Sequence, residues 1–231
     1  MKSRVIVTAL MALLALGTPG KGRAYIMTAD QLIGLMTGNF SKFKTLVITQ
    51  STQVIDTKDQ EIGMALEEKV WLRSPDYYRL ELLGVPGLIR PSGTEKPVLG
   101  EVVAGRESSE MAFRRLLIKN DSQSIKALLS RMGVNLDSVA FTRLDGVIAY
   151  RVGDGAVESP KLLIEKDRFL PLLLNYRSPE RSGGKMVKVR YDDYRKVEGG
   201  WYPFKITCSI GEETLEHYFV LDLQINVPVN P

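Results

Sequence analysis

Apolar and polar residues alternate along most of the chain that follows a short N-terminal stretch. In residues 46–54 and 62–72, apolar side chains recur at every second position and polar side chains lie between them. A period of two is characteristic of a β-strand with one buried face. A turn is predicted over Thr57–Gln60 and a further strand over Tyr77–Leu83. We therefore expect an antiparallel meander rather than parallel βαβ units.

Three segments predict helices instead. Thr28-Ala-Asp-Gln31 is a capping box in front of a first apolar-periodic segment, which Gly38-Asn39 ends. Glu107–Lys119 and Ser122–Met132 predict two more helices in the middle of the chain. Asp121 is positioned as the N-cap of the last one.

The remaining pattern returns to strands. Val85–Pro97 is rich in Pro and Gly and predicts a loop, whereas Asp145-Gly146 predicts a two-residue hairpin turn. Further strands are predicted at residues 138–144, 147–152, 161–165, 169–177, 186–191, 204–210 and 215–225. We expect one domain over residues 25–231, mainly β with helices (α+β), built as a strongly curved antiparallel sheet with a helical lid; the resemblance described below implies the form of an incomplete antiparallel β-barrel.

The apolar face of such a sheet must be covered. Roughly forty residues of helix and loop are available for about nine strands, so the space between is either a ligand-holding hollow or a filled core. The pattern alone favours the filled core. The residues expected to line that space are Leu46, Ile48, Met64, Leu66, Val70, Leu72, Phe204, Ile206, Phe219 and Leu221. The expected lid residues are Leu32, Leu35, Phe113, Leu117, Leu128 and Leu129.

Charge and composition exclude several classes of protein. Lys and Arg number 31 and Asp and Glu 27, but four basic residues lie in the first 24 positions, which hold no acidic residue. The remainder carries 27 of each sign, so it lacks the positive surplus of a nucleic-acid-binding protein. The single Cys208 excludes an intrachain disulfide, and the single His217 excludes a His-rich metal site. We expect no metal and no cofactor.

The first 24 residues have the layout of a secretory signal peptide. Two basic residues precede the apolar run Val5–Leu16, and Ala24 follows at a position suited to signal peptidase. The run is twelve residues long, whereas a bilayer-spanning helix needs about twenty. An uncleaved membrane anchor is the alternative.

Candidate catalytic groups have simpler interpretations. Cys208 and His217 lie opposite each other if Glu212-Glu213 forms the hairpin turn, which would allow a thiol nucleophile beside a base. Both occupy apolar positions without an orienting third residue, so we expect a buried packing cysteine. Neighbouring carboxylates such as Asp192-Asp193 point to opposite faces or lie in turns, and we expect no catalytic residue.

Three stretches carry a resemblance to a known family. In Val70–Glu81, an aromatic and a basic residue precede a Pro and an Arg follows it. Leu162–Pro171 is a strand, a charged turn and a strand, and Val189–Asn226 forms the closing run. In their order and length, these stretches are similar to the periplasmic lipoprotein carrier family (LolA/LolB-like, outer-membrane lipoprotein-sorting proteins).

The resemblance implies a non-enzymatic carrier. It would hold lipoprotein or other lipid acyl chains in the cavity of an incomplete barrel during transfer across the periplasm towards the outer membrane. The implied partners are an inner-membrane exporter and an outer-membrane acceptor, and we expect a monomer. Family carriers often have an Arg directly before the Pro that holds the lid closed. Here Ser74 occupies that position, which leaves Trp71, Arg73 and Arg79 as the nearby latch or rim residues.

Two alternatives stay open at this stage. The same scaffold could serve an envelope-stress sensor or interaction protein that senses lipid or lipoprotein. An enzyme is the third class, although the sequence presents no convergent set of acid, base and nucleophile.

We expect the mature protein to begin near Tyr25 and to be recovered from the periplasm, because the apolar run is too short to stay in the membrane. N-terminal sequencing of protein from native cells tests this. Recovery of intact Met1 in the membrane pellet would contradict it.

Overall fold

The computed structural model describes residues 26–56, 58–75, 77–83, 89–91, 106–118, 120–177 and 185–229. The predicted signal peptide and most of the predicted loop over residues 85–97 lie outside the described residues. Within the described part of the chain, no helix has the length and apolar character needed to cross a bilayer.

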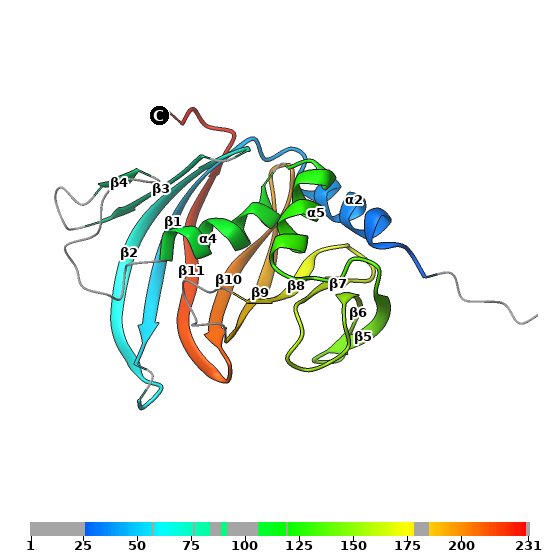
Figure 1. The fold of residues 1–231 in the computed structure, drawn as a ribbon. Helices are drawn as coiled ribbons and strands as arrows, with labels where there is room; N and C mark the ends of the chain where they lie inside the picture. Colours follow the sequence, from blue (N-terminus) through cyan, green and yellow to red (C-terminus); the bar gives the residue numbers. More distant parts are fainter. Residues whose placement is uncertain are drawn as a thin grey trace, which may run out of the picture.

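Within the described residues, eleven strands form one antiparallel sheet, which curves around the helices (Figure 1). The strands are β1 (Thr45–Ile55), β2 (Ile62–Arg73), β3 (Tyr77–Leu82), β4 (Ile89–Pro91), β5 (Val139–Leu144), β6 (Val147–Gly153), β7 (Lys161–Glu165), β8 (Pro171–Arg177), β9 (Met186–Val197), β10 (Gly200–Ile210) and β11 (Glu213–Ile225). Their order is β4-β3-β2-β1-β11-β10-β9-β8-β7-β6-β5. Since β4 and β5 stand at the two ends of this order, the sheet is open, as the prediction of an incomplete barrel requires.

The first strand, β1, lies inside the sheet, and the later strands are added on its two sides. Strands β1 to β4 build one half outwards, and β5 to β11 build the other half inwards until β11 pairs with β1. The connection between the halves contains α4 (Arg106–Arg114), the 3₁₀ helix η1 (Arg115–Leu117) and α5 (Ser122–Arg131). These helices and α2 (Ala29–Asn39) lie against one face of the sheet (Figure 1). We call this covered face the inner face and the opposite one the outer face.

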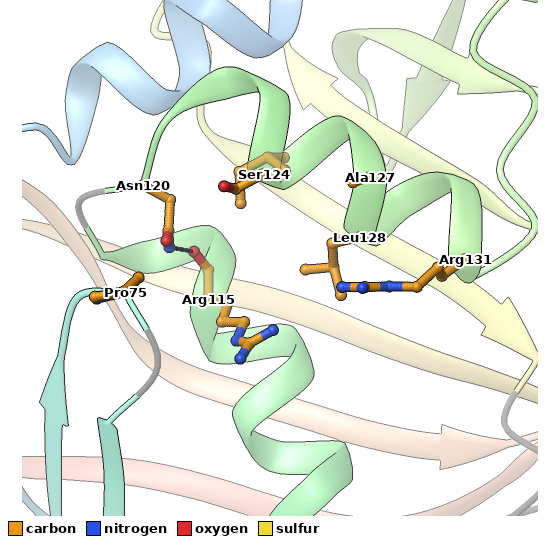
Figure 2. Close-up of a pocket in the computed structure, with 8 residues that line it drawn as sticks. Pro75, Arg115, Asn120, Ser124, Ala127, Leu128 and Arg131 are labelled. Atoms are coloured by element: carbon orange, nitrogen blue, oxygen red, sulfur yellow. Dashed lines mark hydrogen bonds between the residues drawn. The ribbon is translucent and has the colours of Figure 1, made fainter.

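The helix ends follow the predicted capping chemistry. The Thr28 hydroxyl accepts from the backbone N–H of Gln31, and the Gln31 side chain accepts from the Thr28 N–H, which completes the capping box. Asp121 accepts from the backbone N–H of Ser124 at 2.8 Å and so caps α5. Between η1 and α5, the Asn120 amide donates to the Arg115 carbonyl at 2.7 Å (Figure 2).

Some strand predictions need correction. The predicted loop contains β4, which pairs with β3, and β10 begins several residues earlier than predicted. The hairpin between β10 and β11 turns at Gly211-Glu212 rather than at Glu212-Glu213, because Ile210 pairs directly with Glu213. Gly211 has φ +60°, a conformation that glycine adopts without steric cost.

A β-bulge interrupts the pairing of β1 with β11. Thr49 pairs with Asp222 and the next residue, Gln50, pairs with Val220, so Leu221 has no counterpart in β1. An extra residue reverses the facing of every side chain beyond it. The alternation that the sequence shows in β11 therefore does not follow a single face of the sheet.

The bulge overturns two predicted cavity residues. Leu221 is 58% exposed, and Phe219 lies on the outer face, with its ring 5.7 Å from the ammonium of Lys205 and 6.0 Å from the ring of His217. Tyr218, which the pattern places on the polar side, is instead buried on the inner face.

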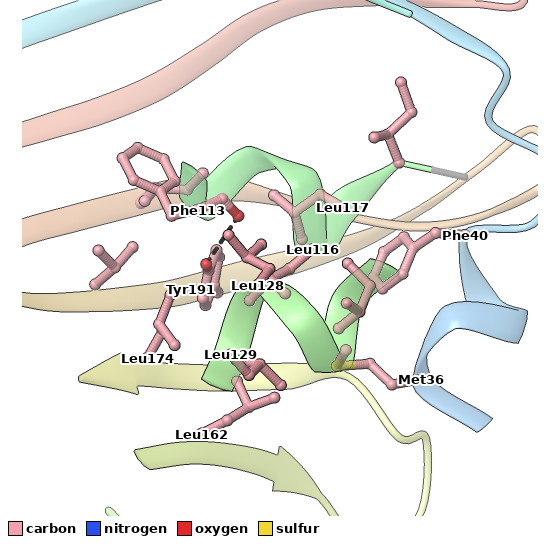
Figure 3. Close-up of a cluster of buried hydrophobic side chains, with 14 of the residues drawn as sticks. Met36, Phe40, Phe113, Leu116, Leu117, Leu128, Leu129, Leu162, Leu174 and Tyr191 are labelled. Carbon is pink, nitrogen blue, oxygen red and sulfur yellow. Dashed lines mark hydrogen bonds between the residues drawn. The ribbon is translucent and has the colours of Figure 1, made fainter. Parts of the chain in front are cut away.

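Helices and sheet share one buried apolar cluster (Figure 3). Of the predicted lid residues, the cluster contains Leu32, Phe113, Leu117, Leu128 and Leu129. Leu35 is 43% exposed and does not belong to it, because α2 turns Leu32, Ile33 and Met36 to the sheet and Leu35 away. The helical side chains pack directly on the sheet, so the structure has a closed interior where an open hollow was considered.

The corrected hairpin separates Cys208 from His217. Cys208 pairs with Glu216 and is fully buried in the apolar cluster, whereas His217 pairs with Thr207. The Thr207 hydroxyl lies 3.0 Å from Nδ1 of His217 on the outer face. Burial, with a contribution from Lys205, lowers the pKa of His217, so the ring is neutral at pH 7. The thiol and the imidazole therefore do not form a nucleophile–base pair.

We expect Cys208→Ala and Cys208→Val to keep the fold and the ligand handling of the parent protein. Loss or exchange of one or two buried heavy atoms costs on the order of 1 kcal/mol of unfolding free energy. Urea unfolding measures this cost. A variant that folds normally but loses all function would show that the thiol does more than pack.

Candidate functional site

The inner face of the sheet beneath the helices is apolar at its centre. Leu46 and Ile48 of β1 and Val70 and Leu72 of β2 are buried there, as is Ile206 of β10. All five were predicted to line the space between sheet and helices, and the register places them together: Leu46 pairs with Leu72, and Ile48 with Val70. This apolar floor contacts side chains of the helices in the buried cluster.

The other predicted lining residues lie at the margin of this floor. Leu66 and Phe204 are half-buried and pack against the cluster. Met64 pairs with Val54 near the β1–β2 turn and is 45% exposed, so it lies beyond the helical cover. The apolar floor is therefore shorter than the alternation in β2 predicts.

A cluster of buried polar side chains lies where the helices meet the sheet. It consists of Gln50, Thr52, Glu68, Glu110, Arg114 and Tyr202, all of which are buried. Gln50 donates from Nε2 to Oε2 of Glu68 at 3.0 Å and to Oε1 of Glu110 at 3.3 Å. We call these six residues the polar cluster.

Arg114 connects α4 to the sheet within the polar cluster. Its Nε donates to Oε1 of Glu110 at 2.8 Å, one helical turn earlier, and its Nη1 donates to the Tyr202 hydroxyl at 3.2 Å. Nη2 donates to Oε1 of Gln50 on β1. Burial lowers the pKa of Arg114, but the attraction of Glu110 more than offsets this, so the pKa lies above its ordinary value. The guanidinium is charged and shielded from water.

The sheet also holds α4 through its tyrosines. The Tyr191 hydroxyl on β9 donates to the Phe113 carbonyl at 3.1 Å (Figure 3). The rings of Phe113 and Tyr218 lie 5.8 Å apart, and the Arg114 guanidinium lies 5.6 Å from the Tyr218 ring. Burial raises the pKa of Tyr191 well above its ordinary value, so this phenol remains a donor.

The polar cluster was not predicted from the sequence, although the alternation in β1 contains a signal of it. Gln50 and Thr52 occupy the same alternation as Leu46 and Ile48, which places polar side chains on a face that is otherwise apolar. Buried polar groups require partners. The partner Arg114 is 64 residues away in the chain, so local pattern gave no means of pairing it with Gln50.

The predicted latch residues do not contact the helices through any described interaction. Trp71 lies between two cations, 4.7 Å from the Arg79 guanidinium and 5.4 Å from the Lys69 ammonium. Arg73 donates to the Val229 carbonyl at 3.3 Å and lies 4.9 Å from the Tyr77 ring. Trp71 and Arg73 occupy the alternate positions of β2, opposite Val70 and Leu72, and Arg79 pairs with Trp71 from β3. The expected latch was a side chain of the sheet that reaches a helix. The structure instead has Arg114, a side chain of α4 that reaches the sheet.

The remaining charged groups form local ion pairs. Arg190 contacts both Asp192 and Asp145, and Lys188 contacts Glu212 at 2.8 Å. Among the described residues, no group of three or more His, Cys, Asp or Glu side chains could hold a metal ion.

No protein-family model matches the sequence, and no curated protein matches it significantly. Solved structures do match. The chain is similar to a LolA superfamily protein from Nitrosomonas europaea, with 10% identity, a TM-score of 0.55 and coverage of 88% of this chain and 96% of that one. It is also similar to a putative outer membrane lipoprotein-sorting protein domain from Vibrio parahaemolyticus, with 9% identity, a TM-score of 0.54 and coverage of 87% and 93%.

A weaker match has no bearing on function. The MucA/MucB complex of Pseudomonas aeruginosa shows 14% identity and a TM-score of 0.30, with coverage of 87% of this chain and 58% of that one. At the identities of the first two matches, similarity establishes architecture only. The chain has a LolA-like fold, in which an open antiparallel sheet is covered on one face by helices.

Proposed function

We propose that this protein is an exported carrier that binds the acyl chains of a lipoprotein or another lipid between the sheet and its helices. The observation that carries the proposal is the apolar floor of Leu46, Ile48, Val70, Leu72 and Ile206, covered by helices of a LolA-like fold. The signal-peptide layout of residues 1–24 supports an exported protein.

In this proposal, the closed interior is the form that the carrier has without its cargo. Side chains such as Phe113 and Leu117 occupy the floor that acyl chains would contact. Replacement of one apolar partner by another conserves most of the buried apolar area, which contributes about 25 cal/mol per Å². Cargo binding therefore requires the helices to move rather than the sheet to rearrange.

The polar cluster makes such a movement less costly than an apolar contact would. A buried ion pair such as Arg114–Glu110 regains hydration when it is exposed, and replacement of such pairs by apolar residues often stabilises proteins. The Arg114 guanidinium also donates to Gln50 and Tyr202 of the sheet, so the contact that holds α4 in a defined position is one that water can replace. In transit, the carrier would receive cargo at the inner membrane and deliver it to an acceptor at the outer membrane, as a monomer in the periplasm.

Leu66→Ser tests the floor, with Leu221→Ser as a matched control on the outer face. Leu66 packs at the margin of the floor and Leu221 is 58% exposed. Loss of one leucine contact with a lipid corresponds to about a tenfold rise in Kd. We expect this rise for Leu66→Ser alone, with a smaller loss of stability than the roughly 2–5 kcal/mol of a full core truncation.

Mass spectrometry measures the lipid that co-purifies with the mature protein and with each variant. Thermal unfolding measures the stability of the same proteins. Equal lipid retention by the parent and both variants would contradict the proposed site. Absence of any lipid, before and after exposure to detergent-solubilised membrane extract, would contradict the carrier function itself.

Arg114→Ala tests the contact between helix and sheet. The change leaves the Glu110 carboxylate buried without its cation, so we expect a loss of about 3–5 kcal/mol of unfolding free energy. The double variant Glu110→Leu with Arg114→Met should recover most of that loss, because no uncompensated charge of the pair remains. Urea unfolding measures both.

The double variant also separates stability from function. If the helices must move for cargo to enter, apolar side chains at positions 110 and 114 of α4, in place of the hydrogen bonds from Arg114 to Gln50 and Tyr202 of the sheet, should slow lipid uptake while the fold remains stable. Uptake at the parental rate would show that this contact does not control access to the floor.

A further inference from the structure

A cleft of about 370 Å³ opens at the rim of the helical cover, and the proposed binding of acyl chains does not use it. It lies between α5, η1 and the β2–β3 turn at Pro75 (Figure 2). Arg115 lines it from η1, and Arg131 lines it from the last turn of α5. The guanidinium groups of both arginines extend into the space between the two helical segments (Figure 2).

The spacing of α5 explains how one side of the cleft is built. The lining of the cleft from α5 includes residues three, four and seven positions after Ser124, namely Ala127, Leu128 and Arg131. This spacing places them along one face of the helix. Lys126 falls on another face, where its ammonium contacts Asp30 at 2.7 Å. The cationic end of this face is therefore Arg131, which forms no ion pair within the described part of the chain.

The described lining of the cleft carries positive charge and no carboxylate. The nearest capping carboxylate, Asp121, accepts from the backbone and hydroxyl of Ser124. These hydrogen bonds lower the pKa of Asp121. Two guanidinium groups around one cleft match the oxygens of a phosphate, which arginine binds with paired hydrogen bonds.

The rest of the cleft is apolar and leads towards the floor. Ile125 and Leu128 are buried at its base. A second, almost filled hollow shares Pro75 and Arg115 with the cleft and is lined further in by Leu72 and Met111. Leu72 belongs to the apolar floor, so the cationic cleft lies beside the proposed acyl site.

We infer that this cleft binds the phosphate group of an anionic lipid whose acyl chains lie on the apolar floor. Arg115 and Arg131 contact the phosphate oxygens, while Ile125 and Leu128 contact the glycerol end of the chains. The inference rests on the proposed carrier function and gives its cargo a chemical class: phosphate-bearing anionic lipids, of which phosphatidylglycerol is the test case.

Binding of three soluble probes to the mature protein tests the inference. The probes are dioctanoyl-phosphatidylglycerol below its micellar concentration, dioctanoylglycerol, which has the same chains without the phosphate, and inorganic phosphate. The variant is Arg115→Gln with Arg131→Gln. Its matched control is Arg143→Gln with Lys166→Gln, which removes the same charge at two exposed positions elsewhere.

We expect the parent to bind the phosphatidylglycerol most tightly, and the cleft variant to raise its Kd at least about tenfold without changing the Kd for dioctanoylglycerol. The control variant should stay within about twofold of the parent at moderate salt, where long-range charge effects are screened. Circular dichroism and thermal unfolding establish that each variant is folded.

Other outcomes overturn the inference in distinguishable ways. Equal affinity for both lipids, unchanged in the cleft variant, leaves the carrier function standing and removes the phosphate site. Inorganic phosphate that binds as tightly as the lipid identifies a free-anion site and removes the lipid as its ligand. Binding of neither lipid contradicts both the inference and the proposed function.

Discussion

The apolar inner face of the sheet must be kept from water, and most of the architecture follows from that constraint. The antiparallel strands place Leu46, Ile48, Val70 and Leu72 side by side, which no strand in the same sheet can cover. Among the described residues, side chains of the helices do so. The α4–η1–α5 connection therefore lies across the sheet at the point where the chain passes from one half to the other.

The cover is not fastened by apolar packing alone. Arg114 reaches from α4 to Gln50 and Tyr202 of the sheet, and Tyr191 donates back to the α4 backbone. Such polar contacts specify one position of the helix, because each donor has a definite acceptor. They also contribute less net free energy than the same area of apolar contact.

A lipid joins apolar chains to a polar head group. The region around the helices likewise has an apolar floor beneath them and a cationic cleft beside them. The chains of the lipid match the apolar floor, and an anionic head group matches a cationic cleft at the rim, where Arg115 and Arg131 lie close to water. Concentration of positive charge in one place is not evident from net charge, since basic and acidic residues balance beyond the first 24 positions. Only the fold brings these arginines to one cleft.

The sequence by itself determined most of the strands, their antiparallel succession and the helix caps at Thr28 and Asp121, because alternation, capping and tight turns depend on near neighbours. Tertiary structure decided what depends on distant partners. The bulge at Leu221 arises from pairing with β1 and turned Phe219 and Leu221 outwards. The Arg114–Gln50 contact joins residues 64 apart, and register and packing over such distances leave no local signal in the chain.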